Sequence, residues 1–124
     1  MLGWPALYMS LDLGASLGEI VRRGADVDLN EIRFTEIEVA LATVADCRNL
    51  SALGVDPVAL FDDWDYSAGQ ALANAVRQAG SEGMLVPSAS RVGDNLIVFP
   101  DLLRPTSTLT IVRTVDPKLI KDAR

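Results

Sequence analysis

The stretch that decides the fold is residues 67–100, SAGQALANAVRQAGSEGMLVPSASRVGDNLIVFP. Its first part carries small apolar side chains at helical spacing, and Gly80 ends the pattern. Ser67 and Gln70 have the spacing of a capping box, in which a serine at the helix N-cap pairs with a glutamine three residues later. The sequence therefore predicts a helix from Ser67 to Ala79. Its apolar stripe consists of Ala68, Ala71, Leu72, Ala75, Val76 and Ala79.

Three apolar runs after this helix predict strands, and turn residues separate them. The runs are Met84–Val86, Asn95–Phe99 and Thr106–Val115. Strands that follow one another across short turns favour hairpin pairing. The C-terminal part of the chain is therefore expected to contain antiparallel strands.

The N-terminal half shows the same two patterns. Residues Ala6–Ser10 alternate between two faces and predict a strand. Apolar side chains at positions 13–21 then fall at helical spacing. The run Glu31–Val44 predicts a long strand whose alternation slips near Thr35 and Glu36, as it does at a β-bulge.

Shorter signals lie between the two halves. Leu50–Gly54 and Pro57–Phe61 predict single helical turns, the second with a proline at its first helical position. We interpret Trp4 and Trp64 as packing side chains. Because helices and strands are mixed and the last strands can form hairpins, the predicted fold class is α+β, not a doubly wound parallel sheet.

The composition fits one domain and excludes several kinds of site. The 124 residues carry a formal net charge of −6, so we expect a single domain over residues 1–124 that binds neither nucleic acid nor an anionic membrane. The chain has one cysteine, Cys47, and no histidine, which excludes an intrachain disulfide, a serine–histidine–aspartate triad and a histidine metal site. We interpret Cys47 as a small buried residue. We interpret Asp62, Asp63 and Asp65 as a solvated acidic turn and expect no metal.

The sequence also bears on localisation. No apolar run reaches the length of a membrane span, and the first residues lack the basic and apolar regions of a signal peptide. We therefore expect a cytoplasmic protein.

Five segments carry a further signal when they are taken in order. They are PALYMS at 5–10, LGEIVR at 17–22, DYSAGQALA at 65–73, GMLVPSAS at 83–90 and NLIVFP at 95–100. In this order and at these separations the chain resembles the RES domain, the toxin half of bacterial toxin–antitoxin pairs. The resemblance covers nearly the whole sequence.

The resemblance implies a fold and an activity. The fold would be similar to that of ADP-ribosyltransferases, with a mixed, split β-sheet flanked by helices around an NAD cleft. The substrate would be NAD⁺, consumed by hydrolysis, by phosphorolysis or by transfer of ADP-ribose to a protein. The implied partner is a helix-turn-helix antitoxin that neutralises the toxin, and the resemblance leaves a homo-oligomer open.

The family's motifs imply the residues of the site. Tyr8, Glu19 and Ser88 match its tyrosine, glutamate and serine, and they are the implied catalytic residues. The implied NAD⁺-binding residues are Tyr8, Ser10, Gln70 and Ser88. Arg91 matches no family motif, and we add it as a candidate to grip the diphosphate because it follows the strand end at Ser88. These residue types suit the chemistry, because breaking the bond between nicotinamide and ribose builds positive charge on the sugar that a carboxylate stabilises.

One family residue has no match. The family's arginine should precede Tyr8, and residues 1–7 contain no arginine. We therefore expect that the chain either lacks the N-terminal segment that bears the arginine or has lost the residue. A degenerate or truncated RES domain that acts as a binding module is the alternative, and an unrelated small α+β domain is the third hypothesis.

Each matched residue also has a purely structural explanation. Ser16 and Glu19 have the spacing of a capping box. Tyr8 suits a strand that packs on a core, and Ser88 suits a turn at a strand end. Gln70 is already explained as the capping partner in the helix that begins at Ser67.

Overall fold

Two sheets and two helices make up the described part of the chain. The computed structural model describes residues 4–11, 34–62, 64–88 and 93–115. The strands are β1 (Leu7–Ser10), β2 (Phe34–Ala40), β3 (Ala45–Asp46), β4 (Gly83–Pro87), β5 (Asp94–Val98) and β6 (Thr108–Val115). The helices are α2 (Pro57–Leu60), α3 (Ser67–Gln78) and the short 3₁₀ helix η1 (Pro100–Leu102).

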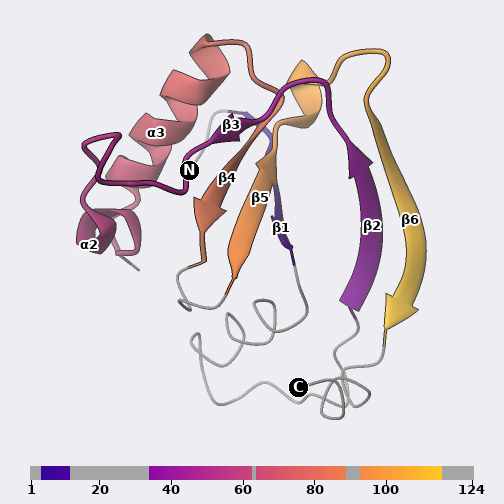
Figure 1. The fold of residues 1–124 in the computed structure, drawn as a ribbon, viewed down its shortest axis with the longest axis horizontal. Helices are drawn as coiled ribbons and strands as arrows, with labels where there is room; N and C mark the ends of the chain where they lie inside the picture. Colours follow the sequence, from indigo (N-terminus) through magenta and orange to yellow (C-terminus); the bar gives the residue numbers. More distant parts are fainter. Residues whose placement is uncertain (1–3, 12–33, 63, 89–92, 116–124) are drawn as a thin grey trace.

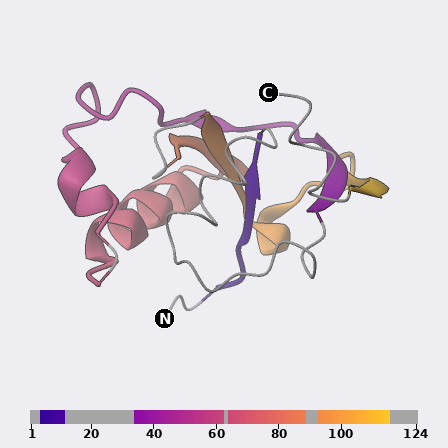
Figure 2. The same ribbon diagram turned by 90° about the horizontal axis from the view of Figure 1, so that it is seen from below.

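The sheet is mixed and split. One part has four strands in the order β1-β5-β4-β3, in which β3 and β4 are parallel and the other neighbours are antiparallel. The other part consists of β2 and β6 alone, paired antiparallel. Helices α2 and α3 lie on one side of the four-stranded sheet, and β2 and β6 lie on the other (Figure 1 and Figure 2). The predicted α+β class is confirmed.

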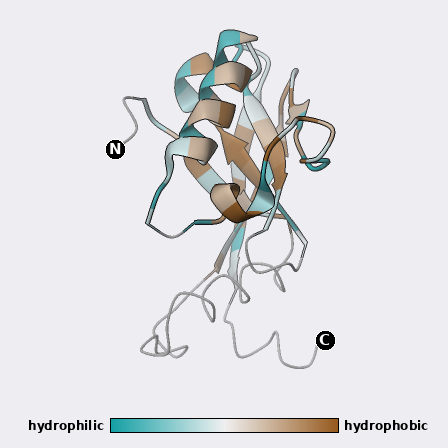
Figure 3. Cartoon of the chain, turned by 90° about the vertical axis from the view of Figure 1, so that its left-hand side faces the viewer, coloured by the Kyte–Doolittle hydropathy of each residue, from teal (hydrophilic) through white to brown (hydrophobic). Residues whose placement is uncertain are grey.

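The core lies between α3 and one face of the four-stranded sheet. Ala73 and Val76 of α3 pack with Met84 and Val86 of β4 and Ile97 of β5. Figure 3 shows the apolar strands behind a helix that is polar on its outer side. Cys47 is buried in this core, which confirms its interpretation as a small buried residue. Burial raises the pKa of its thiol.

Helix α3 begins at the residue that the sequence predicts, but the capping interactions at its N-terminus differ from the predicted ones. Its N-cap is Tyr66, with no side-chain hydrogen bond to the helix, so the predicted capping box of Ser67 and Gln70 is wrong. The carboxylate of Asp65 accepts a hydrogen bond from the backbone N–H of Ser67 at 3.0 Å. Because that acceptor precedes the helix, Ser67 becomes its first residue and not its cap.

The predicted strand Glu31–Val44 is shorter than expected. In the described part it runs from Phe34 to Ala40, and the chain then forms the separate strand β3. The register slips between Glu36 and Ile37, so the predicted irregularity is confirmed. The unpaired residue is Val112, on the partner strand β6.

The remaining short elements agree with the predictions to different degrees. Helix α2 is confirmed, with Pro57 at its start and the Asp56 carboxylate accepting from the N–H of Val58 at 3.0 Å. The segment Leu50–Gly54, predicted as a single helical turn, forms turns with i→i+3 hydrogen bonds that end at Gly54 with φ 70°, and it does not extend into a helix. The predicted helix at positions 13–21 lies outside the described residues.

The two tryptophans have opposite environments. Trp4 packs edge-on against Phe99, with ring centroids 5.3 Å apart, and its indole N–H donates to Asn74 at 3.1 Å. The Arg77 guanidinium lies 4.4 Å from the centre of the Trp4 ring and pairs with Asp101. Trp64 is 93% exposed, so its predicted packing role is wrong.

Glycine is required at the first residue of β4. A Cβ on Gly83 would lie 2.7 Å from the carbonyl oxygen of Ile97 and 3.4 Å from Cδ1 of Leu41. The backbone of Ile97 and the side chain of Leu41 therefore leave no room for a side chain at this position. The contact with Leu41 brings the chain after β2 directly against the four-stranded sheet.

Candidate active site

Three polar side chains gather at one end of the four-stranded sheet. Ser10 of β1 lies opposite Asn95 of β5, and its hydroxyl donates to the Asn95 side-chain oxygen at 3.2 Å. Asn95 in turn lies opposite Val86 of β4, two residues before Ser88. Since opposed residues share a face, the strand ends bring Ser10, Asn95 and Ser88 together.

Ser88 is held at this end by the turn that joins β4 to β5. Its backbone N–H donates to the carbonyl of Gly93 at 3.2 Å, and the residue is fully buried. The serine is therefore ordered by the hairpin and is inside the protein, which a plain strand-end turn residue does not require.

Tyr8 lies on the same face, nearer the middle of β1. It is opposite Ile97, and it precedes Ser10 by two residues, so both side chains point to the same side of the sheet. That side carries the core under α3, but the Tyr8 side chain is 66% exposed. Its ring is therefore available to stack on a planar group instead of being sealed in the core, as the structural explanation supposed.

Gln70 approaches the same end from the helix. It lies in the first turn of α3, and four residues separate the end of this helix from the start of β4. Helix and strand therefore run in opposite directions, so the start of α3 lies beside the end of β4 (Figure 1). Gln70 is partly buried, and with the capping box absent its side chain is not explained by the helix start.

The structure thus places three of the predicted site residues on one sheet face, Ser10 and Ser88 towards one end and Tyr8 level with Met84. Gln70 lies in the first turn of α3. Glu19 and Arg91 lie outside the described residues. Asn95 joins the group through its bond to Ser10, and the sequence signal for it was the NLIVFP segment that follows the turn.

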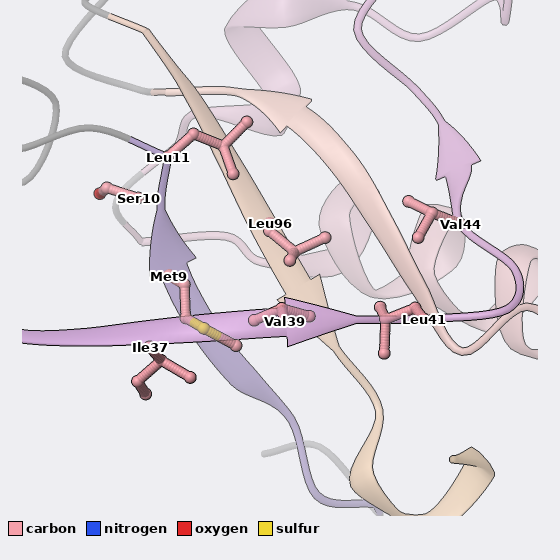
Figure 4. Close-up of a pocket in the computed structure, with 8 residues that line it drawn as sticks. All are labelled: Met9, Ser10, Leu11, Ile37, Val39, Leu41, Val44 and Leu96. Carbon is pink, nitrogen blue, oxygen red and sulfur yellow. The ribbon is translucent and has the colours of Figure 1, made fainter. Parts of the chain in front are cut away.

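The opposite face of the same strands lines an apolar pocket. It encloses about 430 Å³ between the four-stranded sheet and β2. Met9 of β1 and Leu11, the residue after β1, line this pocket. The hydroxyl of Ser10 points away from the centre of the pocket (Figure 4). The lining is Met9, Ser10, Leu11, Ile37, Val39, Leu41, Val44 and Leu96. Tyr8, Gln70 and Ser88 are not part of this lining, whereas Ser10 belongs both to the lining and to the candidate site.

A buried carboxylate fixes the two sheets relative to each other. Glu82 directly precedes β4 and is fully buried. Its Oε1 accepts from the backbone N–H groups of Ala42 at 2.9 Å and Thr43 at 3.0 Å. Its Oε2 accepts from the N–H of Arg104 at 2.9 Å and from the hydroxyl of Ser107.

These donors stand where the two-stranded sheet leaves the four-stranded one. Ala42 and Thr43 follow the end of β2, and Ser107 directly precedes β6. One side chain therefore holds both strands of the second sheet against the first. The hydrogen bonds, with that of Ser107 the strongest, lower the pKa of Glu82 to about 2.

Sequence reasoning missed Glu82. A single glutamate between a helix and a strand looks like an ordinary loop residue, and its donors lie 22 to 40 residues away along the chain. The one available signal is that Glu82 lies directly before an apolar strand. A residue in that position can be carried into the protein with the strand, although the loop before it is exposed. Nothing in the sequence pairs it with residues 42, 43, 104 and 107.

The acidic turn is held by backbone hydrogen bonds to the Asp62 carboxylate. The Asp62 carboxylate accepts from the backbone N–H groups of Trp64 at 2.8 Å and Asp65 at 3.0 Å, which lowers its pKa. Within residues 4–11, 34–62, 64–88 and 93–115, no three histidine, cysteine or acidic side chains are grouped to hold a metal ion. Of the helices in these same ranges, none is long and apolar enough to cross a membrane.

Comparison with known proteins gives a family and a structural neighbour. The sequence model of the RES domain matches residues 2–117. The structure is similar to the toxin in the crystal structure of the M. tuberculosis MbcT–MbcA toxin–antitoxin complex, with a TM-score of 0.77 and 27% sequence identity over 98% of this chain and 72% of that chain. No curated protein matches the sequence. The family match covers nearly the whole chain and agrees with the observed mixed sheet, and the chain therefore belongs to the RES domain family.

Proposed function

We propose that the chain is a RES-domain toxin that cleaves NAD⁺ between nicotinamide and ribose and that a cognate antitoxin neutralises it. The observation that carries the proposal is that Tyr8, Ser10 and Ser88 belong to one face of the four-stranded sheet, with Ser10 and Ser88 towards one end and Tyr8 farther along the face, level with Met84. These are residues that the family's motifs mark, and they come from separate parts of the sequence. The likeness to a toxin of a toxin–antitoxin complex supports the biological setting.

Each residue has a chemical role in this proposal. The exposed ring of Tyr8 stacks on the nicotinamide and shields the reacting bond from water. The buried hydroxyl of Ser88 orients the nicotinamide or its ribose by a hydrogen bond. Ser10 and Gln70 bind polar groups of the rest of the dinucleotide, and Arg91 pairs with the diphosphate.

The reaction needs a carboxylate, and Glu19 supplies it. As the bond between the nicotinamide nitrogen and ribose C1′ breaks, its electron pair leaves with nicotinamide and positive charge grows on the sugar. The Glu19 carboxylate stabilises that charge. Attack at C1′ by water gives ADP-ribose, attack by phosphate gives ADP-ribose 1″-phosphate, and attack by a protein nucleophile gives an ADP-ribosylated protein.

The partner in this proposal is a helix-turn-helix antitoxin. An antitoxin that covers the sheet face on which Tyr8 and Ser88 lie would exclude NAD⁺ from them. Neutralisation is then competition for one surface, and it should weaken as the concentration of NAD⁺ rises.

Incubation of the purified chain with NAD⁺ tests the proposal. We expect release of nicotinamide, measured by chromatography, and the second product identifies the acceptor. ADP-ribose appears without phosphate if water attacks, and the sugar phosphate appears with phosphate if phosphorolysis occurs. Radiolabelled NAD⁺ marks a protein if ADP-ribose is transferred. No release and no labelling under any of these conditions, from a chain that still binds its antitoxin, would favour the binding-module alternative.

A further inference from the structure

An exposed tryptophan lies on a surface that the proposed NAD⁺ cleavage does not use. Trp64 is 93% exposed, Tyr66 on the same loop is 64% exposed, and Val58 of α2 is 76% exposed. Tryptophan and tyrosine are the residues that most often dominate the energy of protein interfaces when they become buried. We define the α2 surface as these three side chains with the carboxylates of Asp56, Asp62 and Asp65.

The loop that presents Trp64 is fixed by its own hydrogen bonds. Asp62 accepts from the backbone N–H groups of Trp64 and Asp65, at 2.8 and 3.0 Å. Asp65 accepts from the N–H of Ser67 at the start of α3, at 3.0 Å. A partner would therefore meet a Trp64 whose backbone is already hydrogen-bonded, which reduces the free energy lost in fixing it.

The charge of this region is one-sided. Between residues 49 and 76 the chain has four aspartates and no lysine or arginine. The flanking cations are engaged in ion pairs, Arg48 with Asp46 and Arg77 with Asp101. An acidic surface around an exposed indole repels phosphates and favours cationic groups, which also stack on the face of an indole.

The α2 surface is apart from the second sheet, and it adjoins the first turn of α3, where the backbone N–H of Gln70 donates to the carbonyl of Tyr66 at 2.9 Å. Helix α2 lies on the side of the four-stranded sheet away from β2 and β6 (Figure 1 and Figure 2). We propose that the α2 surface docks a segment of a partner protein that presents lysine or arginine beside apolar side chains. The docking goes beyond the proposed function and does not depend on NAD⁺ cleavage.

Nuclear magnetic resonance with two synthetic peptides tests this proposal. Both are amphipathic and of equal length, one with arginine and leucine and the other with glutamate and leucine. The chain has two tryptophans, so it gives two indole N–H signals, and Trp64→Phe assigns them. We expect the arginine peptide to shift the Trp64 indole and the backbone amides of residues 56–66, and the glutamate peptide to shift neither.

Two exposed apolar side chains provide the matched comparison. Trp64→Ala should reduce the affinity for the arginine peptide by about tenfold or more, because a central aromatic contact is lost. Ile111→Ala, on β6, removes a side chain that is 71% exposed and should leave the affinity unchanged. Folding of both variants is checked by their amide spectra.

Three results would overturn the proposal. One is an arginine peptide that shifts acidic residues of β2, such as Glu38, as strongly as it shifts the Trp64 loop. Another is equal affinity for Trp64→Ala and the wild-type chain. The last is a Trp64 signal that moves with protein concentration in the absence of peptide, which would mean that a second copy of this chain covers the surface.

Discussion

Replacing Glu19 with glutamine should reduce nicotinamide release by about 100-fold or more. The substitution keeps the size of the side chain and removes the charge that stabilises the growing positive charge on ribose. Binding of NAD⁺ should change little, because the charge develops only as the bond breaks. The measurement is the initial rate of nicotinamide release at saturating NAD⁺, with circular dichroism to verify the fold.

A second glutamate provides the control for this prediction. Glu38 is exposed on β2, outside the residues that line the candidate site. Glu38→Gln makes the same chemical change and should leave the rate of release unaltered. Equal rates for Glu19→Gln and the wild-type chain would remove Glu19 from the reaction.

Replacing Glu82 with glutamine should destabilise the whole fold. Each carboxylate oxygen accepts from at least one backbone N–H, at Ala42 and Thr43 on one side and at Arg104 on the other. A glutamine amide has only one oxygen, so its NH₂ group must face one of these donors and leave it without an acceptor. We expect the thermal unfolding midpoint to fall by several degrees, measured by circular dichroism.

A smaller change at the same cluster serves as the comparison. Ser107→Ala removes one hydroxyl donor and keeps the carboxylate and all of its backbone donors. It should lower the unfolding midpoint by less than Glu82→Gln does. If Glu82→Gln unfolds at the wild-type temperature, the carboxylate does not hold the two sheets together.

The same carboxylate gives stability a defined pH dependence. Its pKa is about 2 in the folded chain, against 4.5 for an unperturbed glutamate. The folded state therefore binds the proton less readily than the unfolded state does, and the stabilisation is complete above about pH 4.5 and is lost as the pH falls towards 2. Urea unfolding across this range should show a steeper loss of stability for the wild-type chain than for Glu82→Gln.

Local sequence patterns predicted those helices and strands whose packing in the fold matches their own hydrophobic periodicity. The helical spacing of small apolar residues marked α3, but the predicted stripe is only partly right. The buried face is centred on Ala73 and Val76, whereas Ala71, Ala75 and Ala79 of the stripe are exposed. Alternation marked β1, β2 and the slip in register near Glu36. The predicted capping box failed because the N–H of Ser67 donates to the Asp65 carboxylate, and the helix is capped by Tyr66 without a side-chain hydrogen bond.

Long-range pairing was beyond these patterns. The final strand followed two others and was expected to join them, yet β6 pairs with β2 across most of the chain. Glu82 determines where β2 ends and β6 begins, and its donors come from two distant loops. The motifs named Tyr8, Ser10 and Ser88, but only the strand register shows that they belong to one face of the sheet.

The most direct test is a crystal structure of the Glu19→Gln variant with NAD⁺ bound. We predict the nicotinamide ring against Tyr8, with Ser88 and the amide of residue 19 within hydrogen-bond distance of the nicotinamide riboside. NAD⁺ in the apolar pocket beside Met9 and Leu96, or residue 19 on the opposite side of the sheet from Tyr8 and Ser88, would contradict it.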